Sequence, residues 1–308
     1  MAVEILSDAM RRIASGDRHV EQIGEGFGGP TGPAEGPVWI AEGGYLLFSD
    51  IHNSRRMRYT PGEGVRVDRE NTDGGNGISR DPEGRLVVCH HLSRRVDREE
   101  ADGTVTVIAD RYHGLKLNRP NDLAIKSDGA IYFSDPPPRI PLTPPDHYPE
   151  LDVAGVYRVS PDLRRINRVV ADLANPNGLC FSPDEKTLYI VDSNRHRKCV
   201  KAYELETNGM LDLGSERLVV DMRGDSRKGG PDGIKCDIEG NVYCTGPGGI
   251  WVFSPQDEHI GTILSDSWTI NMAWGDEDGQ TLYFVGFNTL HRIRLDIPGV
   301  PVPRGIAG

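Results

Sequence analysis

Six positions along this 308-residue chain place a side-chain oxygen at the start of a short apolar run. The six copies recur at intervals of 39 to 56 residues, close to the roughly 40 to 50 residues of a structural repeat with several strands. The positions are Glu35, Asn76, Asn121, Asn177, Asp232 and Asn271. Carboxylate and amide oxygens in loose geometry suit a hard cation, and calcium suits them better than magnesium, which keeps more of its waters. We therefore predict one divalent cation, with Ca²⁺ favoured over Zn²⁺, Mn²⁺ or Mg²⁺; the simpler alternative is that these residues only form turns.

The elements that must position such a ring are six pairs of apolar runs. In each copy the first run ends at a turn, as at residues 81–84, and a second run follows, as at residues 45–50 or 187–192. Hairpins of this size cannot bury their own faces and must stack, and a repeat of this length with several strands is typical of a β-propeller. The sequence therefore predicts an all-β, six-bladed β-propeller in which equivalent residues surround a central axis.

The N-terminal residues are expected to close this ring. Residues 20–308 are predicted to form one propeller domain, and a strand over residues 19–27 is predicted to become the outer strand of the last blade, beside residues 290–295. Residues 1–19 are predicted to form an N-terminal extension. A helix is expected over residues 3–14 of this extension, because its apolar side chains would share one side. These side chains are Val3, Leu6, Met10 and Ile13.

The composition excludes several classes of partner. With 46 acidic and 35 basic residues the formal charge is −11, which disfavours nucleic acid, because phosphate contacts need a basic surface. No apolar run approaches the roughly 20 residues of a membrane span. Arg11 and Arg12 follow the first apolar residues, which is the wrong order for a secretory signal, and five cysteines without paired spacing are typical of reduced thiols. We expect a cytoplasmic protein with a small-molecule substrate; nothing in the sequence indicates the oligomeric state.

One proline-rich segment, residues 136–150, interrupts the repeat. It cannot pair in a sheet, because proline lacks the amide donor, and it follows the second strand of the third blade. Adjacent strands are antiparallel, so this segment leaves at the same end of the propeller as the ring. A stiff loop beside a metal would serve as a lid or specificity wall through Arg139, His147 and Tyr148. The alternative is a surface insertion without a role.

Four short motifs in order carry a resemblance to a known family. They begin at Glu35 (Glu-Gly-Pro-Val-Trp), Arg119 (Arg-Pro-Asn-Asp), Pro176 (Pro-Asn-Gly-Leu) and Pro231 (Pro-Asp-Gly). In this respect the chain resembles the gluconolactonase and senescence-marker-protein (regucalcin) family of six-bladed propellers, over nearly its whole length. The resemblance implies one divalent metal in the central tunnel and hydrolysis of sugar lactones or other small cyclic esters. It also implies roles for matching residues: Glu35, Asn177 and Asp232 as metal ligands, Asn121 at or beside the metal, and Arg119 on the substrate.

The residues also suggest how a lactone would be opened. A metal polarises the carbonyl, and the Asn121 amide adds a donor to the oxygen that gains negative charge. Water must lose a proton, and Asp232 is the preferred base, with Glu35 second; a nucleophilic carboxylate is the other route. Asn76, Asn121 and Arg119 are candidate substrate contacts, and so are His91 and Tyr148. The alternative function is a calcium-binding propeller that acts as a ligand-binding or regulatory module without catalysis.

Two further groups have open interpretations. Many relatives in the resembled family carry Glu-His where this chain has His90 and His91, and either histidine is a candidate for the tunnel while the other packs. Asp50, Asp135 and Asp192 close second strands near the ring. All three are expected to hold the amides of the ring, and for Asp135 and Asp192 the alternative is that they cap the turns that follow.

Overall fold

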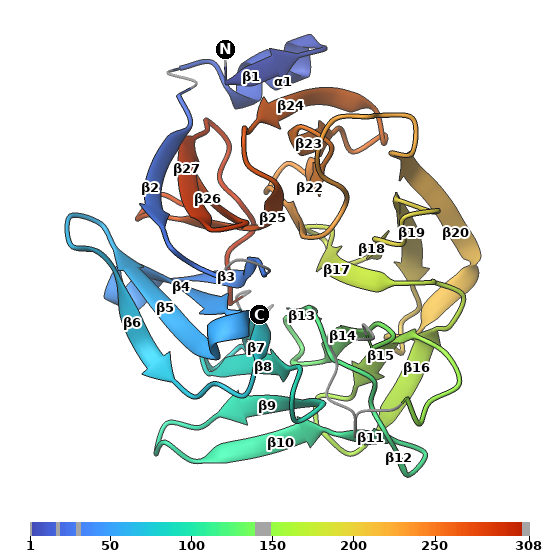
Figure 1. The fold of residues 1–308 in the computed structure, drawn as a ribbon. Helices are drawn as coiled ribbons and strands as arrows, with labels where there is room; N and C mark the ends of the chain where they lie inside the picture. The colour runs from blue at the N-terminus through green and yellow to red at the C-terminus, as the bar shows by residue number, and fades with distance from the viewer. Residues whose placement is uncertain (1, 17–18, 29–31, 139–148, 304–308) are drawn as a thin grey trace.

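Six antiparallel β-sheets of four or five strands surround a central axis (Figure 1). The structure is a computed structural model and describes residues 2–16, 19–28, 32–138 and 149–303. In each sheet consecutive strands follow one another outward from the innermost strand, and in two sheets a strand from the start of the chain is added at the outer edge. The predicted all-β, six-bladed β-propeller is therefore confirmed. No helix in these ranges is long and apolar enough to cross a membrane.

The first half of the chain forms blades 1 to 3. Blade 1 contains β3 (Ala34–Ile40), β4 (Tyr45–Asp50), β5 (Arg55–Thr60) and β6 (Gly64–Glu70), with short 3₁₀ turns at Ala41–Gly43 and Ile51–Asn53. Blade 2 contains β7 (Gly75–Arg80), β8 (Leu86–His90), β9 (Arg95–Glu99) and β10 (Val105–Ala109). A small hairpin, β11 (Arg111–Tyr112) and β12 (Leu115–Lys116), leads to blade 3, which contains β13 (Leu123–Ile125), β14 (Ile131–Asp135), β15 (Gly155–Val159) and β16 (Ile166–Val170).

The second half forms blades 4 to 6. Blade 4 contains β17 (Pro176–Phe181), β18 (Thr187–Asp192), β19 (Cys199–Leu205) and β20 (Leu211–Asp221). Blade 5 contains β21 (Ile234–Cys236), β22 (Val242–Gly246), β23 (Gly249–Phe253) and β24 (His259–Leu264). Blade 6 contains β25 (Thr269–Gly275), β26 (Thr281–Gly286) and β27 (Thr289–Arg294), and it takes its fourth strand from the start of the chain.

That fourth strand is β2 (Glu21–Glu25), which pairs antiparallel with β27. The register places Glu21 beside Arg292 and Glu25 beside Thr289. The prediction that an N-terminal strand closes the last blade is confirmed. The chain runs from β2 in blade 6 directly into β3 in blade 1, so the paired strands β2 and β27 join the first blade to the last. This pairing also covers the outer edge of β27.

The predicted helix over residues 3–14 is wrong at its start. The structure has a strand, β1 (Val3–Ile5), which pairs with β24 as a fifth strand of blade 5, and the helix α1 is limited to Asp8–Ile13. Val3 and Ile5 are β-branched, and the edge of β24 offers unpaired backbone groups, so pairing is preferred to helix. Met10 and Ile13 of α1 are buried between blades 5 and 6.

The core is divided into six apolar clusters, and each lies between two neighbouring blades. The cluster between blades 3 and 4, for example, contains Tyr132, Val156, Leu179, Phe181 and Tyr203. Because each sheet buries both faces against its neighbours, the inner and middle strands are apolar along nearly their whole length. The blades therefore hold one another at fixed spacing around the axis, and the residues on the inner strands have little freedom to move apart.

Candidate active site

The inner strand of a blade leaves regular pairing where it carries its ring residue. In β3 the pairing register shifts between Glu35 and Val38, and comparable shifts occur at the ring residues of β7, β17 and β25. In blades 3 and 5 the ring residue, Asn121 or Asp232, lies just before the strand begins. A β-bulge re-aims a side chain away from the ladder. The register of the inner strands is thus irregular at or beside the ring residues, which all lie toward the same end of these strands.

Backbone contacts between blades bring these positions to one level. The amide of Gly77 donates to the carbonyl of Asn121 at 2.9 Å, and the amide of Gly178 donates to the carbonyl of Asp232 at 3.0 Å. A Cβ on Gly178 would lie only 2.3 Å from that Asp232 oxygen. Glycine after the ring residue is therefore required by the close approach of neighbouring inner strands, and the Asn-Gly and Asp-Gly motifs in the sequence reflect this packing.

Three carboxylates share the ring. Asn271 donates from Nδ2 to Glu35 Oε2 at 2.9 Å and to Asp122 Oδ2 at 3.2 Å. Burial raises the pKa of Glu35 well above its usual range, and the nearby carboxylates of Asp232 and Asp122 raise this pKa further. Hydrogen bonds from Asn271 and the Gly36 amide oppose the increase only in part. The ring therefore concentrates negative charge in a buried volume, where a cation would be favourable.

Sequence reasoning missed Asp122 as a member of the site. It follows the ring residue Asn121, whereas the corresponding position in blades 1, 2, 4 and 5 is glycine. An acid where the repeat otherwise requires glycine was the available signal. Lys235 was also missed: its Nζ lies 3.9 Å from Asp122 Oδ2 and 3.5 Å from Asn271 Oδ1. It supplies a positive charge to the inner side of the ring.

The amide members of the ring are buried, and two of them have oxygens without a hydrogen bond. Asn76, Asn121 and Asn177 are exposed by only 1%, 7% and 3%. Among the described residues, nothing donates to Asn76 Oδ1 or Asn121 Oδ1. Leaving a buried acceptor unsatisfied is unfavourable by about 1–3 kcal/mol, so such oxygens usually have a ligand. Asn177 instead donates from Nδ2 to Ser193 Oγ at 3.3 Å.

The two adjacent histidines have separate surroundings. His91 Nε2 lies 2.8 Å from Asn76 Nδ2 and so contacts the ring; since the amide nitrogen donates, this imidazole nitrogen is the acceptor. His90 lies outside the ring, with Nδ1 3.0 Å from the Thr72 carbonyl and Nε2 3.5 Å from Asp97 Oδ2. Of the two sequence candidates, His91 is the one beside the channel.

The aspartates that close the second strands bond to backbone groups. Asp135 accepts from the amides of Asn118 at 2.8 Å and Arg119 at 2.6 Å. Asp50 accepts from the Gly28 amide, and Asp192 from the amides of Ala174, Asn175 and Asn194. The expectation that they hold the ring amides is not what the structure shows. Asp135 and Asp192 instead fix the backbone that leads into the ring, and Asp192 also caps its following turn.

The remaining predicted contacts lie beside the ring or outside the described residues. Arg119 is half-buried, and its backbone is held by Asp135 two residues before Asn121. Tyr148, together with Arg139 and His147, lies outside the described residues. The foot of this loop is anchored, because Glu150 accepts from the Lys116 amide at 2.8 Å.

The oxygen atoms that could bind a hard cation come from both carboxylate and amide side chains. In residues 2–16, 19–28, 32–138 and 149–303, no group of three or more His, Cys, Asp or Glu side chains is arranged as a metal site. The ring instead offers the carboxylates of Glu35 and Asp232 with the amide oxygens of Asn121 and Asn177. Such a set excludes sites that rely on thiolate or imidazole and is compatible with calcium chemistry.

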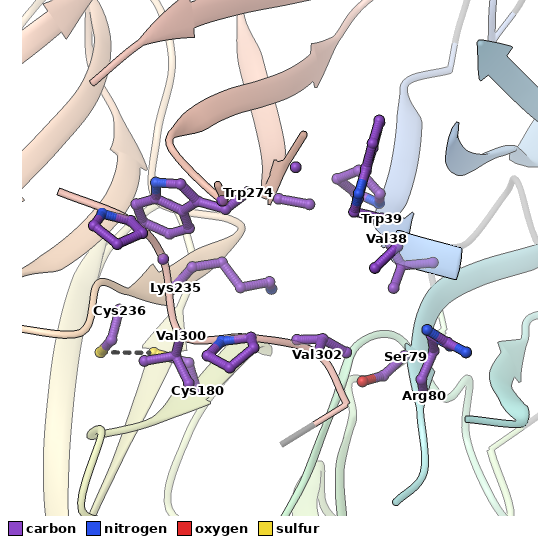
Figure 2. A pocket seen from close by; sticks show the side chains of 18 of the residues that line it. Val38, Trp39, Ser79, Arg80, Cys180, Lys235, Cys236, Trp274, Val300 and Val302 are labelled. Atoms are coloured by element: carbon purple, nitrogen blue, oxygen red, sulfur yellow. Dashed lines mark hydrogen bonds between the residues drawn. The ribbon is translucent and has the colours of Figure 1, made fainter. Parts of the chain in front are cut away.

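Beyond the ring, the same inner strands enclose an apolar cavity of about 410 Å³ (Figure 2). Val38, Ile78, Leu179 and Trp274 line it, and residues 298–302 near the chain end complete its wall. Lys235 belongs to both regions, because its side chain lines the cavity while Nζ approaches Asp122. The channel therefore has a polar end and an apolar end.

Comparison with known proteins agrees with the six-bladed fold. A curated gluconolactonase from Zymomonas mobilis is 33% identical over 281 residues, which covers 85% of this chain and 78% of the relative. The solved structure of a gluconolactonase from Xanthomonas campestris has a TM-score of 0.84 at 31% identity and covers 96% of this chain and 95% of its own. A regucalcin from Agrobacterium tumefaciens, described as a calcium-binding protein, shares the fold with a TM-score of 0.71 at 20% identity, over 88% of this chain and 92% of its own.

The family model described as "SMP-30/Gluconolactonase/LRE-like region" matches residues 33–287. This range begins just before β3 and ends at the last turn of blade 6, so it contains all six ring residues. The chain belongs to the SMP-30/gluconolactonase/LRE-like family.

Proposed function

We propose that this protein, a lactonase by its family and relatives, opens a small sugar lactone or related cyclic ester at the polar end of its channel. The observation that carries the proposal is the buried ring in which carboxylates face amide oxygens that have no hydrogen-bond donor. Glu35, Asn121, Asn177 and Asp232 would hold one divalent cation, with Ca²⁺ the first candidate. When bound, this cation would polarise the lactone carbonyl and stabilise negative charge on its oxygen.

Asp232 is the better candidate for the general base. Glu35 is exposed by only 3%, and its Oε2 already accepts from Asn271 and the Gly36 amide. Asp232 is half-buried, so water in the channel can reach it, and its backbone amide is fixed by the Thr245 hydroxyl at 2.9 Å. A carboxylate that is positioned but accessible can take the proton of an attacking water.

The neighbouring polar groups are suited to hold the substrate. The Asn121 amide lies in the ring and would donate to the carbonyl oxygen as it gains charge. Asn76 and His91 form a hydrogen-bonded pair on the blade 2 side, where they would contact ring hydroxyls of a sugar lactone. Arg119, whose backbone Asp135 fixes, would bind a hydroxyl or carboxylate of the substrate.

A panel assay tests the proposal. Purified protein is treated with chelator and then assayed on aldonolactones, aromatic lactones and phosphotriesters with added Ca²⁺, Zn²⁺, Mn²⁺ or Mg²⁺, and each rate is corrected for spontaneous hydrolysis. We expect aldonolactone hydrolysis that requires metal. Tight metal binding without hydrolysis of any compound would support the non-catalytic calcium-binding module instead.

Isotope labelling separates the two routes for the attacking group. In a single turnover in H₂¹⁸O, attack by water activated at Asp232 places the label in the product acid. Direct attack by the carboxylate forms a mixed anhydride, and hydrolysis of this anhydride at the Asp232 carbonyl places the label in Asp232. We expect label in the product alone.

A further inference from the structure

Two cysteines face each other at the apolar end of the channel. Cys180 on β17 and Cys236 on β21 place their Sγ atoms 3.6 Å apart, across the interface between blades 4 and 5 (Figure 2). Both residues are buried, with exposed fractions of 6% and 4%, and no disulfide joins them in the structure. A disulfide has a sulfur–sulfur length near 2.05 Å, so bond formation requires an approach of about 1.5 Å.

A small oxidant has access to this pair. Both cysteines line the 410 Å³ cavity, whose lining also includes Ile238 and Val302. These two side chains are exposed by 51% and 37%, so the cavity opens to solvent beside them. The thiols are thus shielded from large reagents but reachable by a molecule the size of hydrogen peroxide.

We propose that Cys180 and Cys236 form a redox modification site, at which a peroxide converts the two thiols into a disulfide that joins blades 4 and 5. One thiolate sulfur attacks the peroxide, the O–O bond breaks, and a sulfenic acid and water result. The second sulfur then attacks the sulfenic sulfur and releases another water. Two thiols lose two electrons and two protons in total, and hydrogen peroxide is reduced to two waters.

This disulfide would join the strands that carry two members of the ring. Asn177 lies three residues before Cys180, and Asp232 lies four residues before Cys236. At about 3.3 Å per residue, the cross-link lies roughly 10 to 13 Å from the ring. Since the loop between the cysteines is long, a cross-link here restricts the unfolded chain strongly. We therefore expect a more stable propeller, and the proposal does not depend on the lactonase activity.

Peptide mapping tests the proposal directly. The purified full-length protein is treated with hydrogen peroxide, the remaining thiols are alkylated under denaturing conditions, and the digest is analysed by mass spectrometry. We expect three alkylated cysteines and one linked peptide pair that contains Cys180 and Cys236. A disulfide between other cysteines, oxidation of either thiol only to sulfinic acid, or five alkylated cysteines after treatment would overturn the proposal.

Variants and a melting experiment supply the controls. Oxidation should raise the melting temperature by about 5 °C, and dithiothreitol should reverse the increase. C180S and C236S should abolish both the linked peptide and the increase. C199S is the matched control, because Cys199 is also buried in blade 4 and is not part of the Cys180–Cys236 contact; it should keep both effects. If C180S fails to fold, the peptide map of the unmodified sequence still decides the proposal.

Discussion

The two ends of the central channel are built from the same six inner strands but have opposite chemistry. At one end Glu35, Asp122 and Asp232 gather in a buried ring, and burial and mutual repulsion raise the pKa of Glu35. Two or three residues further along, Val38 and Leu179 line an apolar cavity. The comparison shows that the two parts of an inner strand have different roles. The irregular start of the strand carries the proposed ligands, and the regularly paired remainder packs the blades together.

The largest expected effect is on activity at the polar end. Asp232→Asn and Glu35→Gln should each lower lactone hydrolysis by roughly 10²- to 10⁴-fold, because each removes a proposed ligand charge, and Asp232 also the base. Measured after chelation, the melting temperature should not fall below that of the chelated original protein, since neither substitution removes apolar packing. Steady-state kinetics with saturating metal and circular dichroism melting are the measurements. Full activity of a metal-saturated variant would show that its carboxylate has no role in the reaction.

The opposite result is expected at the apolar end. Leu179→Ala removes a side chain that is 1% exposed in the cluster between blades 3 and 4, only two residues beyond Asn177. Stability should fall by about 2–5 kcal/mol, as for other large-to-small changes in a core. The turnover number at 25 °C should stay within a few-fold of the original value. A comparable loss of turnover would break the division of roles, because packing and ligand positions would then be inseparable.

The repeat pattern was sufficient to predict the fold. Alternating apolar runs with turn residues between them predict both the strand pairs and their number, and the ring residues follow from equal register in each copy. The structure brings Glu35 and Asn271 into direct contact, although they are far apart in the chain. The sequence could predict this contact because the blades are related by rotation, so residues at the same position in each repeat lie close together around the axis.

The departures from prediction have local causes. The strand β1 depends on a free edge of β24, which only the assembled sheet provides. Lys235 has no counterpart of its type in the other copies, so periodicity gives no signal for it, whereas Asp122 is visible only as an acid at a position where four other copies have glycine. Asp135 accepts hydrogen bonds from two backbone amides, and the positions of these amides cannot be read from residue types alone.

Removal of the cation should lower stability by an amount within the lower half of the range expected for Leu179→Ala. A ligand that binds only the folded ring stabilises it, by about 2.7 kcal/mol when the free ion is a hundredfold above its dissociation constant. We therefore expect chelation to lower the melting temperature and readdition of calcium to restore it. Elemental analysis of metal-replete protein is the companion measurement. An unchanged melting temperature, together with no bound metal, would contradict the proposed ring.

A smaller effect is expected for the substrate contact. Arg119→Ala should raise KM for the best polar lactone about tenfold and leave metal affinity unchanged, because it removes a substrate contact and no ligand. Arg164→Ala is a control, since Arg164 is exposed and pairs with Asp162 in the turn between β15 and β16. If Arg119→Ala leaves the ranking of lactones unaltered, specificity lies with His91 or the loop at residues 136–150.

The smallest effect is expected from a substitution of Lys235, which lies between the polar end and the apolar end of the channel. Its ammonium is 3.9 Å from Asp122, so it partly neutralises the ring that is proposed to hold a cation. Lys235→Met keeps an unbranched side chain against the apolar cavity but removes the charge. Calcium affinity should therefore increase, by at least about threefold, because the carboxylates lose a competing cation and the charges interact at short range in a buried site.

Isothermal titration measures this change, and Lys201→Met is the matched control, since Lys201 pairs with Asp172 and Glu216 in blade 4. Weaker calcium binding in Lys235→Met would show that the lysine orders Asp122 and Asn271 for the ion rather than competing with it, and the two ends of the channel would then be mechanically joined through this one side chain.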